Sequence, residues 1–98
     1  MNSDEIVIER RNRVTHGEYV ASFDEKATAG RLSWTLRDGA RDAQHTHVPA
    51  AMRGRGIAAR LVEALVRDAR SEGFKIIPSC TYVAAQFDRH PDWADLRA

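Results

Sequence analysis

The sequence has few cysteines, little net charge and no long apolar run, and each of these absences excludes a class of protein. Cys80 is the one cysteine among its 98 residues, so an internal disulfide is excluded. Lys and Arg number 15 against 14 Asp and Glu, and this balance gives no general attraction to nucleic acid or to a membrane surface. No run approaches the ~20 apolar residues of a membrane span, and the charged start of the chain lacks the apolar core of a signal peptide.

The absence of repeats and of low-complexity or linker-like segments favours a single domain over residues 1–98. We expect this domain to reside in the cytoplasm, with neither nucleic acid nor a membrane as its partner. A short sheet with an exposed edge is compatible with a monomer or a homodimer.

The first half of the chain predicts four antiparallel strands. Residues 5–10, 17–23, 29–36 and 40–48 concentrate β-forming residues or alternate polar with apolar ones, and polar turns separate them. A hairpin at residues 11–16 and turns at residues 24–26 and 37–39 join the strands. The alternation in the third strand places Leu32, Trp34 and Leu36 together on one face.

The second half predicts a helix, a strand and a second helix. Apolar residues recur at helical spacing from Ile57 to Ala69, with Gly73 as the stop and with Asp68 assigned to the polar face. Residues 74–77 resemble a buried parallel strand, and residues 81–88 a short amphipathic helix. The fold class is therefore α/β, with a mixed α+β sheet in which four antiparallel strands lead into a βαβ unit.

Two glycines stand where the predicted long helix begins. Gly54 and Gly56 permit a sharp turn that exposes backbone N–H groups, and the start of a helix leaves about four such groups unpaired. Together they favour binding of an anion such as a phosphate or pyrophosphate. The local charge also favours an anion, because six basic and three acidic residues lie in the segment from Arg53 to Lys75.

Three glycine motifs could account for this turn. The pattern G-x-x-x-x-G-K-[ST] does not occur. The dinucleotide pattern G-x-G-x-x-G/A is met by Gly54, Gly56 and Ala59, but residues 49–52 separate the turn from its strand and no acidic residue ends the next strand. The coenzyme A pattern [QR]-x-x-G-x-[GA] is met by residues 53–58 and opens a helix.

At this point residues 40–93 resemble the GCN5-related N-acetyltransferase family, and within it the very short members. The resemblance is carried by the segments Thr46-His47-Val48-Pro49, Arg53-Gly54-Arg55-Gly56-Ile57-Ala58, Pro78-Ser79-Cys80 and Phe87-Asp88-Arg89-His90-Pro91. It implies a reduced version of the family's fold with acetyl-CoA as co-substrate. It also implies that the strands on either side of the long helix splay apart to admit the pantetheine arm.

The resemblance assigns coenzyme A contacts to two segments. Arg53, Gly54, Arg55, Gly56, Ile57 and Ala58 would hold the pyrophosphate, with a further contact from Arg60. The backbone of Thr46, His47 and Val48 would pair with the pantetheine amides. A backbone N–H near Val48 would stabilise the oxyanion of the tetrahedral intermediate.

Three residues are candidates for the chemistry. Cys80 is a nucleophile or an acid for the departing thiolate, or else a small buried apolar residue. His45 is a general base, or else an ordinary exposed strand histidine. Tyr82 is a candidate acid, as a tyrosine is in many family members. The His45-x-His47 spacing lacks a zinc-ligand framework, so no metal is expected.

The leading functional hypothesis is transfer of an acetyl group from acetyl-CoA to an amine by direct attack in a ternary complex. One alternative is a two-step transfer through Cys80. Another is a module that binds acyl-CoA with little catalysis, because the chain is short for building an acceptor pocket. The acceptor is an amine on a small molecule or on a protein.

Overall fold

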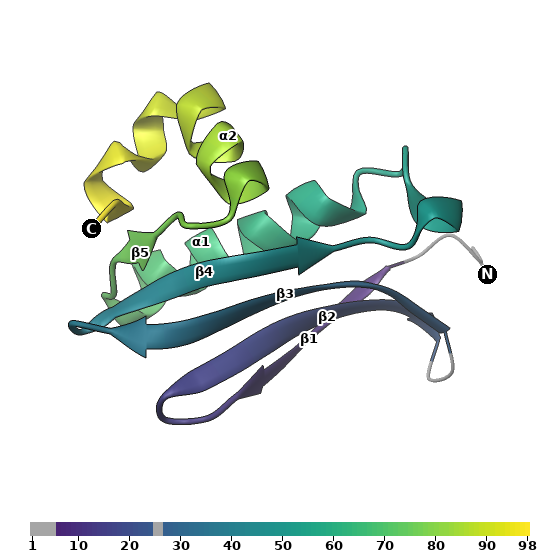
Figure 1. Ribbon diagram of the computed structural model, residues 1–98, viewed down its shortest axis with the longest axis horizontal. Helices are drawn as coiled ribbons and strands as arrows, with labels where there is room; N and C mark the ends of the chain where they lie inside the picture. Colours follow the sequence, from purple (N-terminus) through teal and green to yellow (C-terminus); the bar gives the residue numbers. More distant parts are fainter. Residues whose placement is uncertain (1–5, 25–26) are drawn as a thin grey trace.

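The computed structural model describes residues 6–24 and 27–98, so Glu5 of the first predicted strand and residues 25–26 of the second turn lie outside it. Five strands form one sheet in the order β1-β2-β3-β4-β5 (Figure 1). They span Val7–Asn12, His16–Asp24, Ala27–Arg37, Ala40–His47 and Ile76–Ile77. Strands β1 to β4 are antiparallel and β5 is parallel to β4. The predicted fold class is confirmed.

Two positions interrupt the regular pairing of the sheet. In β2 the register shifts on either side of Ser22. Between β3 and β4, Trp34 faces Ala43 whereas Ser33 faces His45, which leaves Gln44 as an extra residue in β4. An extra residue of this kind is a β-bulge, and it changes which face the following side chains occupy.

The long helix α1 spans Ile57–Glu72 and ends at Gly73, whose φ of 80° suits a glycine C-cap. The second helix α2 spans Thr81–Arg89, and 3-10 turns cover Ala50–Met52 and Pro91–Leu96. Figure 1 shows α1 behind the sheet and α2 above β4. The strand predicted at residues 74–77 is shorter than expected, because the N–H of Phe74 closes the helix end on the carbonyl of Ala69.

The apolar core lies between one face of the sheet, α1 and the C-terminal segment. Its largest fully buried side chains are those of Trp34, Tyr19, Leu32, Ile57, Leu61, Leu65, Ile76, Val62 and Val83. Leu36, predicted to share the buried face with Leu32 and Trp34, is 46% exposed because it lies near the end of β3. Among the described residues, no helix is long and apolar enough to cross a membrane.

Asp68 was wrongly assigned to the polar face of α1. It is only 9% exposed, and the buried Tyr19 hydroxyl donates a hydrogen bond of 2.6 Å to its Oδ2. Arg10 lies 3.0 Å from its Oδ1 and also pairs with Glu72 at 3.3 Å. This polar cluster joins β1 and β2 to α1.

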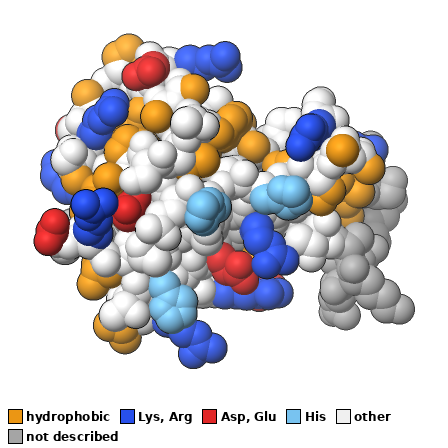
Figure 2. All heavy atoms as spheres, in the orientation of Figure 1, with side chains coloured by type: hydrophobic (Ala, Val, Ile, Leu, Met, Phe, Trp, Pro, Cys, Tyr) orange, Lys and Arg blue, Asp and Glu red, His pale blue; other side chains and the backbone are white. Residues whose placement is uncertain are grey.

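None of the described helices covers the other face of the sheet, which is polar. Figure 2 shows histidine side chains and charged side chains of both signs across the middle of this face. Glu18 of β2 lies 3.7 Å from both Arg11 and Arg31, and Arg37 lies 3.6 Å from Asp42. We refer to this surface, formed by β1 to β4 on the side opposite α1, as the open face.

Candidate active site

The loop before α1 has the backbone geometry that its glycines permit. Gly54 and Gly56 have φ of 87° and 73°, and Gly56 is the N-cap residue of α1. A Cβ at either position would meet no atom within 4 Å, so the loop faces open space. Among the described residues, no side chain caps the start of α1 and its first turn contains no acidic residue, so its unpaired N–H groups are available to an anion.

A cavity of about 200 Å³ lies against this loop. It is lined by Val48, Met52, Arg53, Gly54, Gly56, Ile57, Ala58 and Tyr82. Six of these eight residues were predicted as coenzyme A contacts, and Tyr82 was a catalytic candidate. Arg53 also donates a hydrogen bond of 3.4 Å to the carbonyl of Val48, which ties the loop to the end of β4.

A second hollow of about 410 Å³ lies beside the same loop and is lined by Ile6, Phe23, Arg55 and Arg60. The guanidinium of Arg55 lies over the ring of Phe23, 5.4 Å from its centroid. Arg60 donates a hydrogen bond of 3.1 Å to the carbonyl of Ile6. Arg55 and Arg60, both predicted to contact phosphate, thus line the same hollow. Arg55 contacts the end of β2, and Arg60 contacts the residue that precedes β1.

Strands β4 and β5 diverge after Asp42. They pair only through Arg41 and Asp42, and the N–H of Cys80 then donates a 2.8 Å hydrogen bond to the carbonyl of Ala43. Beyond Ala43, no described strand pairs with β4 on this side. Backbone groups of the last residues of β4 can therefore pair with an extended ligand.

Cys80 and Thr46 meet at this divergence. Their Sγ and Oγ1 atoms are 3.5 Å apart, and Cys80 is the N-cap residue of α2. Burial raises the pKa of the Cys80 thiol, but interactions with the Thr46 hydroxyl and with the backbone of Val83 and Tyr82 outweigh it, so the pKa is lowered overall. The half-buried thiol therefore loses its proton more readily than that of a free cysteine, and the thiolate is the nucleophilic form.

Tyr82 follows at the first turn of α2 and lines the same cavity as the loop. Its hydroxyl accepts a hydrogen bond of 3.2 Å from Nε2 of Gln86. Burial raises the pKa of Tyr82, so the side chain carries its proton at neutral pH. It can therefore donate a proton to a group bound in the cavity.

The two histidines of β4 lie elsewhere. Leu32, in the core, faces Thr46 across the strands, whereas Ser33 faces His45 and Arg31 faces His47. His45 and His47 are thus exposed on the open face, and Thr46 and Cys80 lie on the side of α1 and α2. The structure brings Cys80, Tyr82 and the loop together, and it separates His45 from them by the thickness of β4.

Sequence reasoning missed two residues next to this site. Met52 lines the cavity of the loop, and Gln44 forms the bulge beside the divergence of β4 and β5. Neither belongs to the motif or to an apolar periodicity, so no sequence signal marked them. Among the described residues, no group of three or more His, Cys, Asp or Glu is arranged to hold a metal ion.

The sheet with its diverging parallel pair, and the glycine-rich loop opening α1, place this chain among proteins with an acetyltransferase fold. A GCN5-like protein from Staphylococcus aureus matches with a TM-score of 0.68 and 21% identity, over 92% of this chain and 87% of that one. AAC(6')-Iy, solved with the bisubstrate analogue CoA-S-monomethyl-acetylneamine, matches with a TM-score of 0.57 and 15% identity, over 84% of this chain and 63% of that one.

A GNAT-family protein from Desulfovibrio desulfuricans matches with a TM-score of 0.58 and 16% identity, over 76% of this chain and 54% of that one. At these identities the likeness concerns the fold. The family described as GCN5-related N-acetyl-transferase matches residues 18–96. The chain belongs to this family.

Proposed function

We propose that the protein transfers an acetyl group from acetyl-CoA to an amine acceptor by direct attack in a ternary complex. The observation that carries the proposal is the open glycine loop at the start of α1, which adjoins a cavity reaching Tyr82. The family supports acetyl transfer in general. The direct mechanism and the amine acceptor are our inference.

The residues present fit coenzyme A. N–H groups at the start of α1 and the guanidinium groups of Arg53 and Arg55 would bind the pyrophosphate, because charge-assisted hydrogen bonds are the strong ones. The unpaired edge of β4 from Thr46 to Val48 would bind the pantetheine amides. Bound in this way, the thioester would lie near Cys80 and Thr46.

In the transfer step, the amine nitrogen forms a bond to the thioester carbonyl carbon and the carbon–sulfur bond breaks. A backbone N–H near Val48 would stabilise the oxyanion, and Tyr82 would protonate the departing thiolate. The proton of the attacking amine would pass toward the open face, where His45 is exposed. Holding both reactants on β4 supplies the advantage of proximity.

A second route is favoured by the position of Cys80 at the divergence of β4 and β5, where its Sγ lies 3.5 Å from Oγ1 of Thr46 and polar contacts lower its pKa. Its thiolate would attack the thioester carbon and release coenzyme A as the leaving thiolate, which takes up a proton. The amine would then attack the acetyl-cysteine and regenerate the thiol. Mass spectrometry of the protein with acetyl-CoA and no amine would reveal an added acetyl group on Cys80, and its absence would argue against this route.

The test of the direct proposal begins with binding. Gly56→Asp places a carboxylate at the start of α1, and we expect the affinity for acetyl-CoA to fall at least about tenfold, the equivalent of losing one charge-assisted hydrogen bond. Gly39→Asp is the matched control, because Gly39 also has a positive φ of 81° and open space around it but lies in the β3–β4 turn.

Isothermal titration calorimetry measures both variants against the unaltered protein. Unchanged affinity in Gly56→Asp, or equal losses in both variants, would refute the proposed site. Product formation with a panel of amines follows. Tight binding without any acetylated amine would instead identify a module that binds acyl-CoA.

A further inference from the structure

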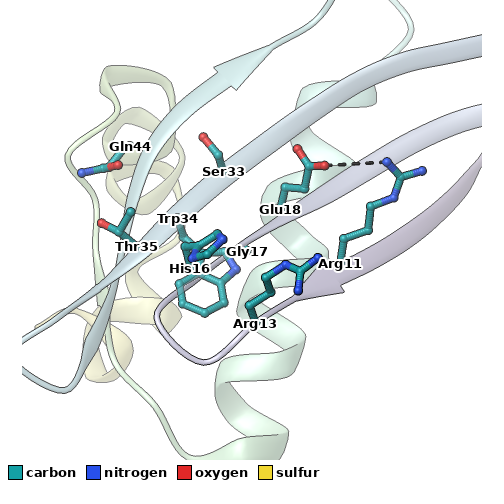
Figure 3. Close-up of a pocket in the computed structure, with 9 residues that line it drawn as sticks. All are labelled: Arg11, Arg13, His16, Gly17, Glu18, Ser33, Trp34, Thr35 and Gln44. Atoms are coloured by element: carbon teal, nitrogen blue, oxygen red, sulfur yellow. Dashed lines mark ion pairs between the residues drawn. The ribbon is translucent and has the colours of Figure 1, made fainter.

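A hollow of about 500 Å³ lies on the open face, which none of the described helices covers (Figure 3). β1 contributes Arg11 to its lining, the β1–β2 turn contributes Arg13, and β2 contributes His16, while Ser33 and Thr35 come from β3. Gln44, the bulge residue of β4, completes it on the side of the candidate active site. The hollow is separate from the cavity of the glycine loop, and they share no lining residue.

The charge of this hollow favours an anion. Arg11 pairs with Glu9 at 2.9 Å and with Glu18 at 3.7 Å, and Glu18 lies equally close to Arg31. Arg13 also lines the hollow, and it makes no ion pair with any residue of the described chain. Glu9 and Glu18 thus compensate the charge of Arg11, and Glu18 is shared with Arg31, so the positive charge that the lining leaves without a counter-ion among the described residues is that of Arg13.

Neutral hydrogen-bond donors stand beside the arginines. The hydroxyl groups of Ser33 and Thr35 are half-buried, and within the described residues neither makes a side-chain hydrogen bond. The amide of Gln44 is exposed, and it too makes no side-chain hydrogen bond within the described residues. Hydroxyl, amide and guanidinium donors converging on one hollow are the groups that bind carboxylate and phosphate oxygens.

The hollow adjoins the strand that we assign to catalysis. Ser33 lies directly opposite His45 in the sheet, so their Cβ atoms are about 5 Å apart. On the other side of β4, Thr46 meets Cys80. A molecule with one end in the hollow can therefore reach the thioester position by extending past His45 and through the opening between β4 and β5 beyond Ala43, where no described strand pairs with β4.

We propose that this hollow is the acceptor subsite, and that the acceptor is an amine carrying a carboxylate or phosphate group several atoms from its nitrogen. This inference rests on the proposed function and adds the chemical class of the acceptor. Arg13 binds the anionic group as a specificity residue. Ser33, Thr35 and Gln44 supply neutral donors, and His45 lies along the path of the amine.

The test compares acceptors that differ only in the anionic group. 4-Aminobutyrate is paired with butylamine, 6-aminohexanoate with hexylamine, and phosphoethanolamine with ethanolamine. With saturating acetyl-CoA and mass-spectrometric detection of the acetylated amine, we expect kcat/KM to be about tenfold higher for the anionic member of a pair. The carboxylate and phosphate arms identify which anion the hollow prefers.

Arg13→Gln should raise KM for the anionic acceptors about tenfold and leave the uncharged amines unchanged. Arg67→Gln is the matched control, because Arg67 is an exposed arginine of α1 away from the open face. Direct binding is followed by NMR with 4-aminobutyrate or inorganic phosphate and no acetyl-CoA. Amide shifts at Arg13, Ser33 and Gln44 that disappear in Arg13→Gln support the subsite.

The outcomes separate the two proposals. Equal acetylation of charged and uncharged amines, with no amide shifts in the hollow, overturns the acceptor subsite and leaves acetyl transfer standing. Amide shifts in the hollow without acetylation of any amine support the anion site and refute the proposed transfer. Equal effects of Arg13→Gln and Arg67→Gln on KM also overturn the subsite.

Discussion

The buried contact between Tyr19 and Asp68 provides a direct test of what holds α1 against the sheet. Tyr19 is 0% exposed, and its hydroxyl donates a 2.6 Å hydrogen bond to the carboxylate of Asp68. Tyr19→Phe removes this donor and retains the aromatic packing. Asp68 then keeps Arg10, 3.0 Å from its other oxygen, as its compensating charge.

The magnitude follows from the type of bond. A hydrogen bond to a charged group contributes about 1.5–3 kcal/mol. Because Arg10 remains in place, no uncompensated charge is created, and we expect Tyr19→Phe to lower the free energy of unfolding by about 2 kcal/mol. For a domain of this size, that loss lowers Tm by roughly 8–16 °C.

Urea unfolding followed by circular dichroism measures the change, with the m-value expected to stay constant. Tyr82→Phe is the matched control, because the Tyr82 hydroxyl takes part in one partly buried bond of 3.2 Å with the neutral Gln86. That variant should lose only about 0.5–1 kcal/mol. Equal losses in the two variants, or a loss below about 0.5 kcal/mol in Tyr19→Phe, would refute the assignment of Asp68 as a buried, charged partner.

Two further predictions concern titrating groups. Polar contacts lower the pKa of Cys80, so its alkylation by iodoacetamide should reach half its maximal rate at a lower pH than that of a free cysteine. Thr46→Val should move this midpoint to higher pH, and an unchanged midpoint would contradict the Thr46 contact. Burial and Asp68 raise the pKa of Tyr19, so above pH ~10 the unfolded chain loses this proton while the folded chain keeps it, and stability falls by about 1.4 kcal/mol per pH unit. Tyr19→Phe should show a smaller alkaline decline in urea unfolding, and an identical slope would count against the burial argument.

The elements of this fold could be predicted because the chain repeats simple patterns. Alternation marked β3, helical spacing marked α1, and Gly73 marked its end. Asp68 shows where such interpretation fails. It lies three residues after Leu65, on the apolar stripe of α1, but a carboxylate usually indicates an exposed position. Its buried position depends on Tyr19 and Arg10, which come from strands distant in the sequence, so no local pattern predicts it.

In the candidate site, too, the part built from a local motif could be predicted and the part built from contacts between distant segments could not. The glycine loop is a local motif, and its backbone geometry is the one that glycines at 54 and 56 permit. The environment of Cys80 depends on contacts between distant segments, because Thr46 is 34 residues away along the chain. Residue type alone could not separate a nucleophile from a small buried side chain at this position.

The bulge at Gln44 decides which side of β4 each of these groups occupies. In a regular strand, residues 43, 45 and 47 would share the face toward α1, and Thr46 would lie on the open face with Asp42. The extra residue reverses this order beyond Ala43, so Thr46 faces Leu32 and turns toward Cys80 while His45 turns outward beside Ser33. One inserted residue thus gives the end of β4 one side that faces Cys80 and another that borders the arginine-lined hollow. No periodicity in the sequence predicts the position of this residue.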